Sequence, residues 1–336
     1  MLASPLRQCI VTNRALPTGE FFDSRIYSFL NTIPTIDFLI RLTAMRVPPS
    51  RLPSGKAPGP QGLLVPDGLL HSKYTHRKAG RASYILCWRE AVLKLQKGSF
   101  KRISPHVTYS PRLPDYIVHL LRLRVLQEFE LLAERLEYRV KMLKQPKTDS
   151  SVILRRLTRA EWELMRSSDF IPYQNTLAVL IVPPVNKDII TRTRPEGSMS
   201  VAPTEVNVRT KPATRPLSVL MPASQKMENE LAPQAISSLL VPLYHGTTAF
   251  PNCSQRSALY SLLVRILASE RFMKKRRRGA SPPRNEGVES SKASHAFLLC
   301  SDENTGKRGD AAGVARALWR LRMFEGEGWQ HSDHSC

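Results

Sequence analysis

Residues 177–182 read LAVLIV, and Pro183 and Pro184 follow at once. Six apolar residues in a row, ended by prolines, are typical of a buried strand. This is the clearest strand signal in the chain. We therefore expect the segment to lie in the core, within a sheet that other elements cover.

Three further short apolar runs predict strands. They are 83–88 (SYILCW), 239–244 (LLVPLY) and 294–300 (SHAFLLC). Proline has no N–H to donate to a neighbouring strand, so Pro242 predicts that the second of these runs lies at a sheet edge.

A long helix is predicted over 115–144. Pro114 stands at its start with Asp115 in the first turn, where both residues are favourable. Apolar residues then recur three and four positions apart, from Ile117 to Leu143. Thr158 and Glu161 have the spacing of a capping box, which predicts another helix from 158 onward. The remaining helices are expected at 90–96, 254–273 and 310–324.

Together these elements predict an α/β (α+β) fold, a small mixed β-sheet covered by helices, with disordered inserts. One core domain is expected from 69–182 and 236–326. Before it, 21–68 is expected to hold two short helices and a proline-rich loop. A proline-rich insert at 183–235 and a tail at 327–336 are expected to be disordered.

Composition excludes several classes of protein. The five cysteines are scattered and form no C-x-x-C pair, which argues against a disulfide framework and against a cysteine zinc site. No apolar run reaches the length that spans a bilayer. No motif predicts a cofactor, a metal or a set of catalytic residues. The sequence makes no prediction about oligomeric state.

Charge is the strongest functional signal. The net charge is +22 over 336 residues, and the basic segment 69–114 holds ten Lys or Arg against one acid, Glu90. Such a field attracts polyanions, and aromatic residues among the cations favour RNA. The predicted nucleic-acid-binding residues are Lys73, Tyr74, Arg77, Lys78, Arg81, Arg89, Lys101 and Arg102. The alternative is a solvated rim of charge with no partner.

These features favour a non-enzymatic protein associated with RNA or a ribonucleoprotein. A second hypothesis is an assembly or respiratory-maintenance factor that uses the basic segment on an anionic membrane or an acidic protein partner. The run of five cations at 274–278, expected in a loop, is open to three interpretations: a nuclear import signal, a second polyanion contact, or a solvated loop.

The first twenty residues have the make-up of a mitochondrial transit peptide. Arg7 and Arg14 are not balanced by any acid before Glu20, and no long apolar run follows them. The mitochondrial matrix is therefore the expected location, and the nucleus is the alternative.

An enzyme is the remote alternative. Residues 244–247 (YHGT) resemble the first-strand motif of ADP-ribosyltransferase-like folds, in which the histidine contacts a ribose. The glycine–aromatic strand that this family carries further on is replaced here by a predicted helix. An enzyme hypothesis then requires a crevice in which His245 meets Asp302, which follows the strand at 294–300.

Overall fold

The computed structural model describes residues 6–17, 38–46, 62–76, 80, 82–104, 106–142, 152–187, 192–199, 215–224, 239–278 and 293–327. Mixed sheets with helices confirm the α/β class. The chain divides into two compact units, whereas the sequence analysis expected one core domain. Unit 1 comprises Met1–Phe22, Pro34–Gln127 and Ala317–Cys336, and unit 2 comprises Asp23–Ile33 and Glu128–Arg316. Helices α2 (Leu113–Met142) and α7 (Ala312–Phe324) contribute residues to both units.

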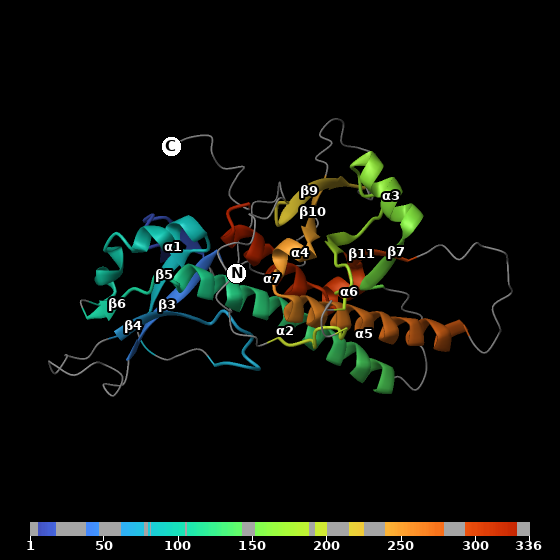
Figure 1. The fold of residues 1–336 in the computed structure, drawn as a ribbon, viewed down its shortest axis with the longest axis horizontal. Coiled ribbons are helices and arrows are strands. Elements are labelled where there is room, and N and C mark those ends of the chain that lie inside the picture. Colours follow the sequence, from blue (N-terminus) through green and yellow to red (C-terminus); the bar gives the residue numbers. More distant parts are fainter. Residues whose placement is uncertain are drawn as a thin grey trace. The chain divides into compact units, whose positions relative to one another are not determined.

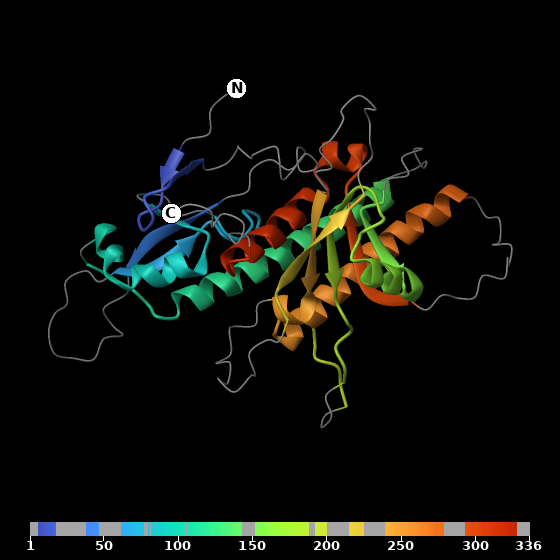
Figure 2. The ribbon, with the colours of Figure 1, turned by 90° about the horizontal axis from the view of Figure 1, so that it is seen from above.

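Unit 2 is built on a five-stranded sheet of order β7-β11-β8-β10-β9. Its strands are β7 (Leu154–Thr158), β8 (Thr176–Ile181), β9 (Ser218–Ala223), β10 (Leu239–His245) and β11 (Ala293–Cys300). Strands β8 and β10 are parallel, and every other pair is antiparallel. Strands β9 and β10 run side by side in both views (Figures 1 and 2).

The LAVLIV run forms β8, the central strand, and both faces of the sheet are covered. On one face, Val179 and Leu298 pack in a buried cluster with Met165 of α3 (Arg159–Ser168). On the other, the Phe297 ring meets the Tyr260 ring of α5 (Cys253–Arg278) edge-on, with centroids 6.3 Å apart. Burial on both sides explains the continuous apolar runs 177–181 in β8 and 296–299 in β11, which do not alternate with polar residues.

Unit 1 is built on a four-stranded sheet of order β5-β3-β4-β6. Its strands are β3 (Leu39–Arg46), β4 (Gly62–Asp67), β5 (Ser83–Leu86) and β6 (Val107–Thr108). Helix α1 (Arg89–Leu95) buries Ala91, Val92 and Leu95, and the first half of α2 buries a stripe that includes Ile117 and Leu121. A hairpin of β1 (Leu6–Gln8) and β2 (Ala15–Pro17) reaches β5 through a bridge between Cys9 and Tyr84.

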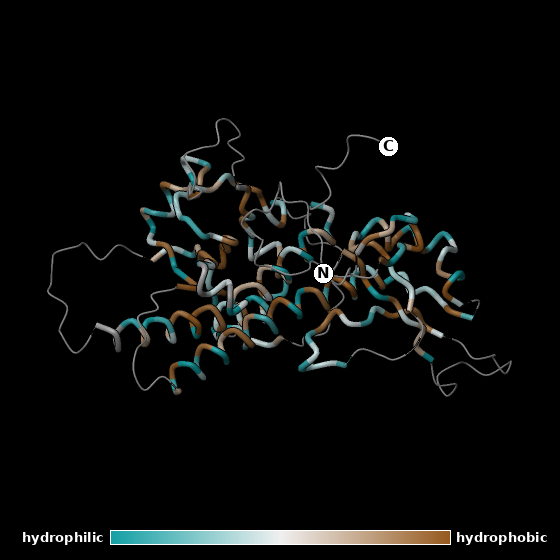
Figure 3. Tube along the Cα trace, turned by 180° about the vertical axis from the view of Figure 1, so that it is seen from behind, coloured by the Kyte–Doolittle hydropathy of each residue, from teal (hydrophilic) through white to brown (hydrophobic). Residues whose placement is uncertain are grey.

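The predicted long helix and capping box are confirmed. Helix α2 covers 113–142, and polar and apolar residues alternate along it (Figure 3). At the start of α3, Glu161 N–H donates to Thr158 Oγ1 (3.2 Å), and Thr158 N–H donates to Glu161 Oε2 (2.8 Å). The periodicity and the capping box each depend on residues close together in the sequence, so both could be recognised without knowledge of the tertiary contacts.

Two elements of unit 1 differ from expectation. The segment 39–46, expected as a helix, is strand β3, and 62–67, expected as loop, is strand β4. A short apolar run does not distinguish a helix from a strand by its spacing, and β3 is held by partners on both sides. Residues 18–37 and 47–61 lie outside the described ranges.

Strand β10 is not at the edge of its sheet, which corrects the prediction from Pro242. It lies between β8 and β9, and β9 is the edge strand. Its pairing with β8 begins only at Leu243, so Pro242 occupies a position where β9 alone is paired. Pro66 in β4 is similar, because β6 pairs only with Gly62 and Leu63. A proline therefore prevents pairing with a second neighbouring strand only at its own position. The rest of the strand can still lie between two others.

The segment 183–235 also differs from a wholly disordered insert, because it supplies strand β9. In addition, its residues 192–199 contact the start of α5. Ser198 N–H donates to Ser254 O (3.3 Å), and a Cβ on Gly197 would lie 3.1 Å from the backbone nitrogen of Ala258. Glycine is therefore needed for this close approach.

Candidate nucleic-acid interface

Four exposed cations gather where α1 turns into the short 3-10 helix η2 (Ser99–Arg102). They are Lys94, Lys97, Lys101 and Arg102, and we call them the cationic corner. Between the two helices Gly98 adopts φ 106°, a left-handed conformation that favours glycine and reverses the chain within one residue. The four positive side chains thus lie within nine residues of sequence, on either side of this turn.

No carboxylate neutralises most of this corner. Lys97, Lys101 and Arg102 make no ion pair with an acid in the part of the chain that the structure describes. Their charge is thus available to an external anion. Lys94 and Lys97 were counted in the basic segment but not singled out as site residues, because charge counting does not show which cations share a surface.

Three aromatic residues pack beneath the corner. The Nζ atom of Lys94 lies 5.5 Å from the centroid of the Trp88 ring, and the rings of Phe100 and Tyr109 lie 5.9 Å apart. The Tyr109 hydroxyl donates to Val92 O (3.4 Å), so Tyr109 contacts α1 directly and η2 through the Phe100 ring. Burial raises the pKa of Tyr109, and the negative charge of Asp115 raises it further.

Lys73 and Tyr74 are in a separate place. They lie on a turn in which the amides of Tyr74 and Thr75 donate to His71 O. His71 N–H is in turn bound by Gln127 Oε1 of α2 (3.0 Å). Tyr74 is 40% exposed, and Lys73 Nζ lies 5.7 Å from the centroid of its ring.

The turn and the start of α1 are attached to α2 at distant points. Gln127 holds the turn, whereas Asp115 holds α1, and twelve residues of helix between them span about 18 Å. Lys73 therefore lies apart from the cationic corner, and the described cations of the basic segment do not form one group.

Arg89 forms ion pairs within unit 1. Its Nη2 lies 2.5 Å from Asp115 Oδ1, and its Nη1 lies 3.8 Å from Glu325 Oε1. Arg122 joins the same cluster: burial lowers its pKa, and the charges of Glu325 and Asp115 act in the opposite direction. Because Arg89 is paired with two carboxylates, it offers less charge to a ligand, and its assignment as a binding residue stays a prediction.

Arg77, Lys78 and Arg81 lie outside the described residues, and their role stays a prediction. Between them Gly80 is described, with φ 109°, and its carbonyl accepts from Arg41 Nη2 (3.1 Å). Arg41 also pairs with Asp67 on the neighbouring strand, so this cation too belongs to the fold.

The five-cation run at 274–278, expected in a loop, forms the last turns of α5. The first strong helix breaker after Met273 is Gly279, and cations are favourable at the C-terminus of a helix. Lys274 is exposed. The helical conformation explains the run structurally without assigning it a partner.

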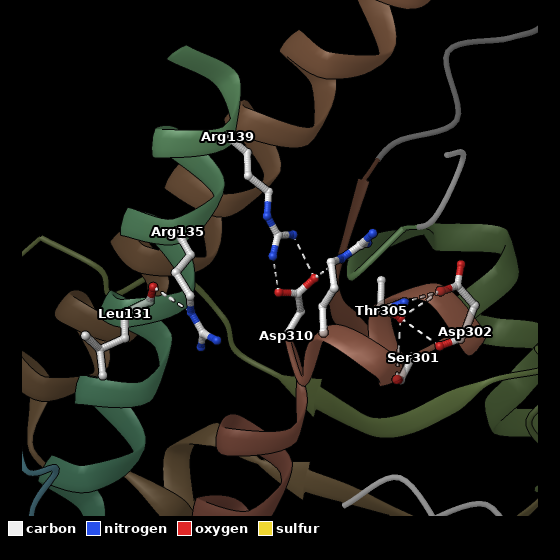
Figure 4. Close-up of polar contacts among 8 residues, drawn as sticks. Leu131, Arg135, Arg139, Ser301, Asp302, Thr305 and Asp310 are labelled. Atoms are coloured by element: carbon white, nitrogen blue, oxygen red, sulfur yellow. Dashed lines mark hydrogen bonds and ion pairs between the residues drawn. The ribbon is translucent and has the colours of Figure 1, made fainter. Parts of the chain in front are cut away.

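His245 and Asp302 do not meet. His245 pairs in register with Ile181 at one end of β8, whereas Cys300, two residues before Asp302, pairs with Thr176 at the other end. Five residues of strand separate these ends by roughly 17 Å. Asp302 is instead the N-cap of α6 (Glu303–Arg308), where its Oδ1 accepts from the amide and the hydroxyl of Thr305, both at 2.8 Å (Figure 4). The crevice that the enzyme alternative required is absent.

Within the described residues, no group of three His, Cys, Asp or Glu side chains is arranged to hold a metal ion. In the same ranges no helix is long and apolar enough to cross a bilayer. Comparison with protein-family models, with curated proteins and with solved structures finds no match.

Proposed function

We propose that this protein binds RNA, by itself or within a ribonucleoprotein, through the cationic corner of unit 1. One observation carries the proposal: Lys97, Lys101 and Arg102 lie exposed within six residues, without a carboxylate partner in the described ranges. The net charge of +22 adds a long-range attraction to any polyanion. Tyr74 with Lys73 provides a second, smaller contact on the turn that Gln127 of α2 holds.

An anionic membrane is a weaker candidate for the same corner. Binding to a membrane surface combines charge with apolar side chains that enter the interface. Only Leu93, 38% exposed, is a large exposed apolar residue on α1 and η2. Phosphate contacts alone suffice for RNA, so RNA fits the corner better.

Reversing Lys97, Lys101 and Arg102 to glutamate tests the proposal. We expect the affinity for RNA to fall at least about tenfold, and the slope of log K against log salt to flatten by about 2–3, because each lost phosphate contact removes counterion release. Filter binding or fluorescence anisotropy between 50 and 300 mM salt (about these limits) measures both quantities.

The matched control reverses three exposed cations of unit 2, Arg166, Lys187 and Arg194. It changes the net charge by the same amount and leaves the corner intact. If both triple variants lose affinity equally, binding follows net charge and the corner has no special role. Binding of the native protein to anionic vesicles but not to RNA would favour the membrane candidate.

Import into the mitochondrial matrix, proposed from Arg7 and Arg14, has a structural consequence. The hairpin 6–17 packs on β5: Cys9 is fully buried, Ile10 N–H donates to Tyr84 O (3.0 Å), and Leu86 N–H donates to Cys9 Sγ (3.3 Å). Arg7 also covers the Tyr84 ring at 5.4 Å. A signal in this position has to be retained, since its removal would uncover β5.

Deleting residues 1–17 is therefore expected to lower the free energy of unfolding of unit 1 by about 1–3 kcal/mol. Urea unfolding measures the loss, and replacement of the exposed Leu6 by serine is the control, expected to have little effect. An unchanged stability after deletion would show that the hairpin is dispensable and compatible with cleavage.

A further inference from the structure

The aromatic rings of the cationic corner are only partly exposed. Trp88 and Phe100 are both less exposed than Tyr74 and Tyr116, the aromatic residues with large exposed areas in the described part of unit 1. Lys94 covers the Trp88 ring, and a Cβ on Gly326 would lie 3.5 Å from Trp88 Nε1. Phe100 packs on Tyr109 at an interplanar angle of 34°.

This arrangement limits what the corner can recognise. Proteins that bind single-stranded RNA gain about 1–3 kcal/mol for each base that stacks on an open aromatic side chain. With its rings only partly exposed, the corner gains less from stacking and presents mainly the charged ends of Lys94, Lys97, Lys101 and Arg102. What remains available is the phosphate backbone, which has the same chemistry for every sequence.

Phosphates are presented most densely by a duplex. In B-DNA a double strand carries one charge per about 1.7 Å of axis, twice the density of each strand, and the release of counterions per contact is greater than for a single strand. Double-stranded RNA is likewise recognised mainly through its shape and its phosphates, since its deep major groove hides the base edges.

We infer that the cationic corner binds the phosphate backbone of base-paired RNA, independently of sequence, and does not bind unpaired bases. This inference rests on the proposed RNA-binding function and specifies its substrate class. The cations follow one another closely: Lys97 N–H donates to Lys94 O (3.2 Å) at the end of α1, and η2 with its two cations begins directly after Gly98.

The test compares two RNAs of equal phosphate number with the full-length protein: a 20-base-pair duplex (about two helical turns) and an unstructured single strand, both of mixed sequence. We expect the duplex to bind at least about fivefold more tightly. Four contacts predict a salt slope of about −3.6 for the duplex and about −2.8 for the single strand. Changing the sequence of the duplex should leave its affinity unchanged.

Trp88→Phe is the companion variant, because it keeps an aromatic ring at this position and alters its stacking area. It should bind the duplex as tightly as the native protein. If the single strand binds at least as tightly as the duplex, and Trp88→Phe weakens binding of the single strand, bases stack at the corner. The inference about base-paired RNA is then wrong, and the proposed RNA binding is unaffected. If neither RNA binds, the proposed function itself fails, and the inference fails with it.

Discussion

Replacing Asp310 by alanine is expected to lower the free energy of unfolding of unit 2 by about 1.5–3 kcal/mol, because a buried carboxylate that binds two partly exposed arginines is lost. Asp310 is fully buried, and Arg139 of α2 binds it with both terminal nitrogens, of which Nη1 lies 2.7 Å from Oδ2 (Figure 4). Arg308 Nε donates to the same Oδ2 at 3.0 Å. Removing the carboxylate leaves two guanidinium groups without their common partner.

The contribution of Asp310 to the stability of the folded state is expected to decrease at low pH. Burial alone would raise its pKa, but the hydrogen bonds from Arg139 and Arg308 outweigh it and hold the pKa below its usual range. A carboxyl group with a lowered pKa stabilises the folded state above its unfolded pKa, near 4, and this stability is lost as the pH falls through the lower, folded value. Asp310→Asn should remove this acid-dependent contribution while it keeps the side-chain volume.

The control is Glu163→Gln, which breaks the exposed i,i+4 pair with Arg159 and should change stability by less than about 0.5 kcal/mol. Urea unfolding from about pH 3 to about pH 7 measures the free energy of unfolding of all three variants. Should Asp310→Ala fail to fold, the double variant Arg139→Met with Asp310→Leu tests the same point, because an apolar pair ought to recover stability. A small effect of Asp310→Ala at neutral pH would show that the pair contributes little.

Glu270→Gln is expected to act in the opposite direction and to stabilise unit 2 above neutral pH. Glu270 is buried on α5, and its Oε1 accepts the N–H groups of Ile153 (2.7 Å) and Leu154 (3.0 Å) at the start of β7. Burial raises its pKa to about 7, and these two hydrogen bonds and Lys274 only partly offset the effect. Close by, burial raises the pKa of Cys300 to about 12, and the charge of Glu270 contributes to the shift.

Because the pKa of Glu270 is raised in the folded state, its effect on stability changes with pH in the opposite direction to that of Asp310. The contribution of Glu270 is fully present below about pH 4.5 and is lost as the pH rises through 7, a change of up to about 3 kcal/mol. Glutamine cannot ionise, yet its amide oxygen still accepts from Ile153 and Leu154. At pH 8 we therefore expect Glu270→Gln to be more stable than the native protein, and at pH 4.5 the two should be similar.

Hydrogen exchange at the amides of Ile153 and Leu154 reports on this contact directly, and urea unfolding at both pH values gives the free energy. Glu270→Ala is the matched variant, because it removes the acceptor as well as the charge and should lose protection at both amides at every pH. If the native protein and Glu270→Gln change in parallel with pH, the carboxyl of Glu270 is not the group that titrates.

Much of the secondary structure was predictable from the sequence. Strand β8, strand β11, helix α2 and the capping box of α3 all follow from patterns contained within about thirty residues. The predicted concentration of charge also has a counterpart in the structure, because the exposed cations of α1 and η2 lie in the basic segment. Two assigned members of that segment, Lys73 and Arg89, belong to other places in unit 1.

Contacts between residues distant in sequence escaped prediction. Segments 39–46 and 62–67 are strands because they pair with each other, and nothing within either of them reveals its partner. Likewise, the spacing between His245 and Asp302 carries no information on which end of β8 each residue adjoins.

The sequence by itself determined which stretches are buried, which helix is long and where positive charge accumulates, because periodicity and composition act over short ranges. Only the tertiary structure decided that the strands form two sheets, that carboxylates neutralise Arg89, and that Asp310 lies between Arg139 and Arg308. The physical reason is that strand pairing and ion pairing depend on distance in space, which the fold sets, and not on separation along the chain.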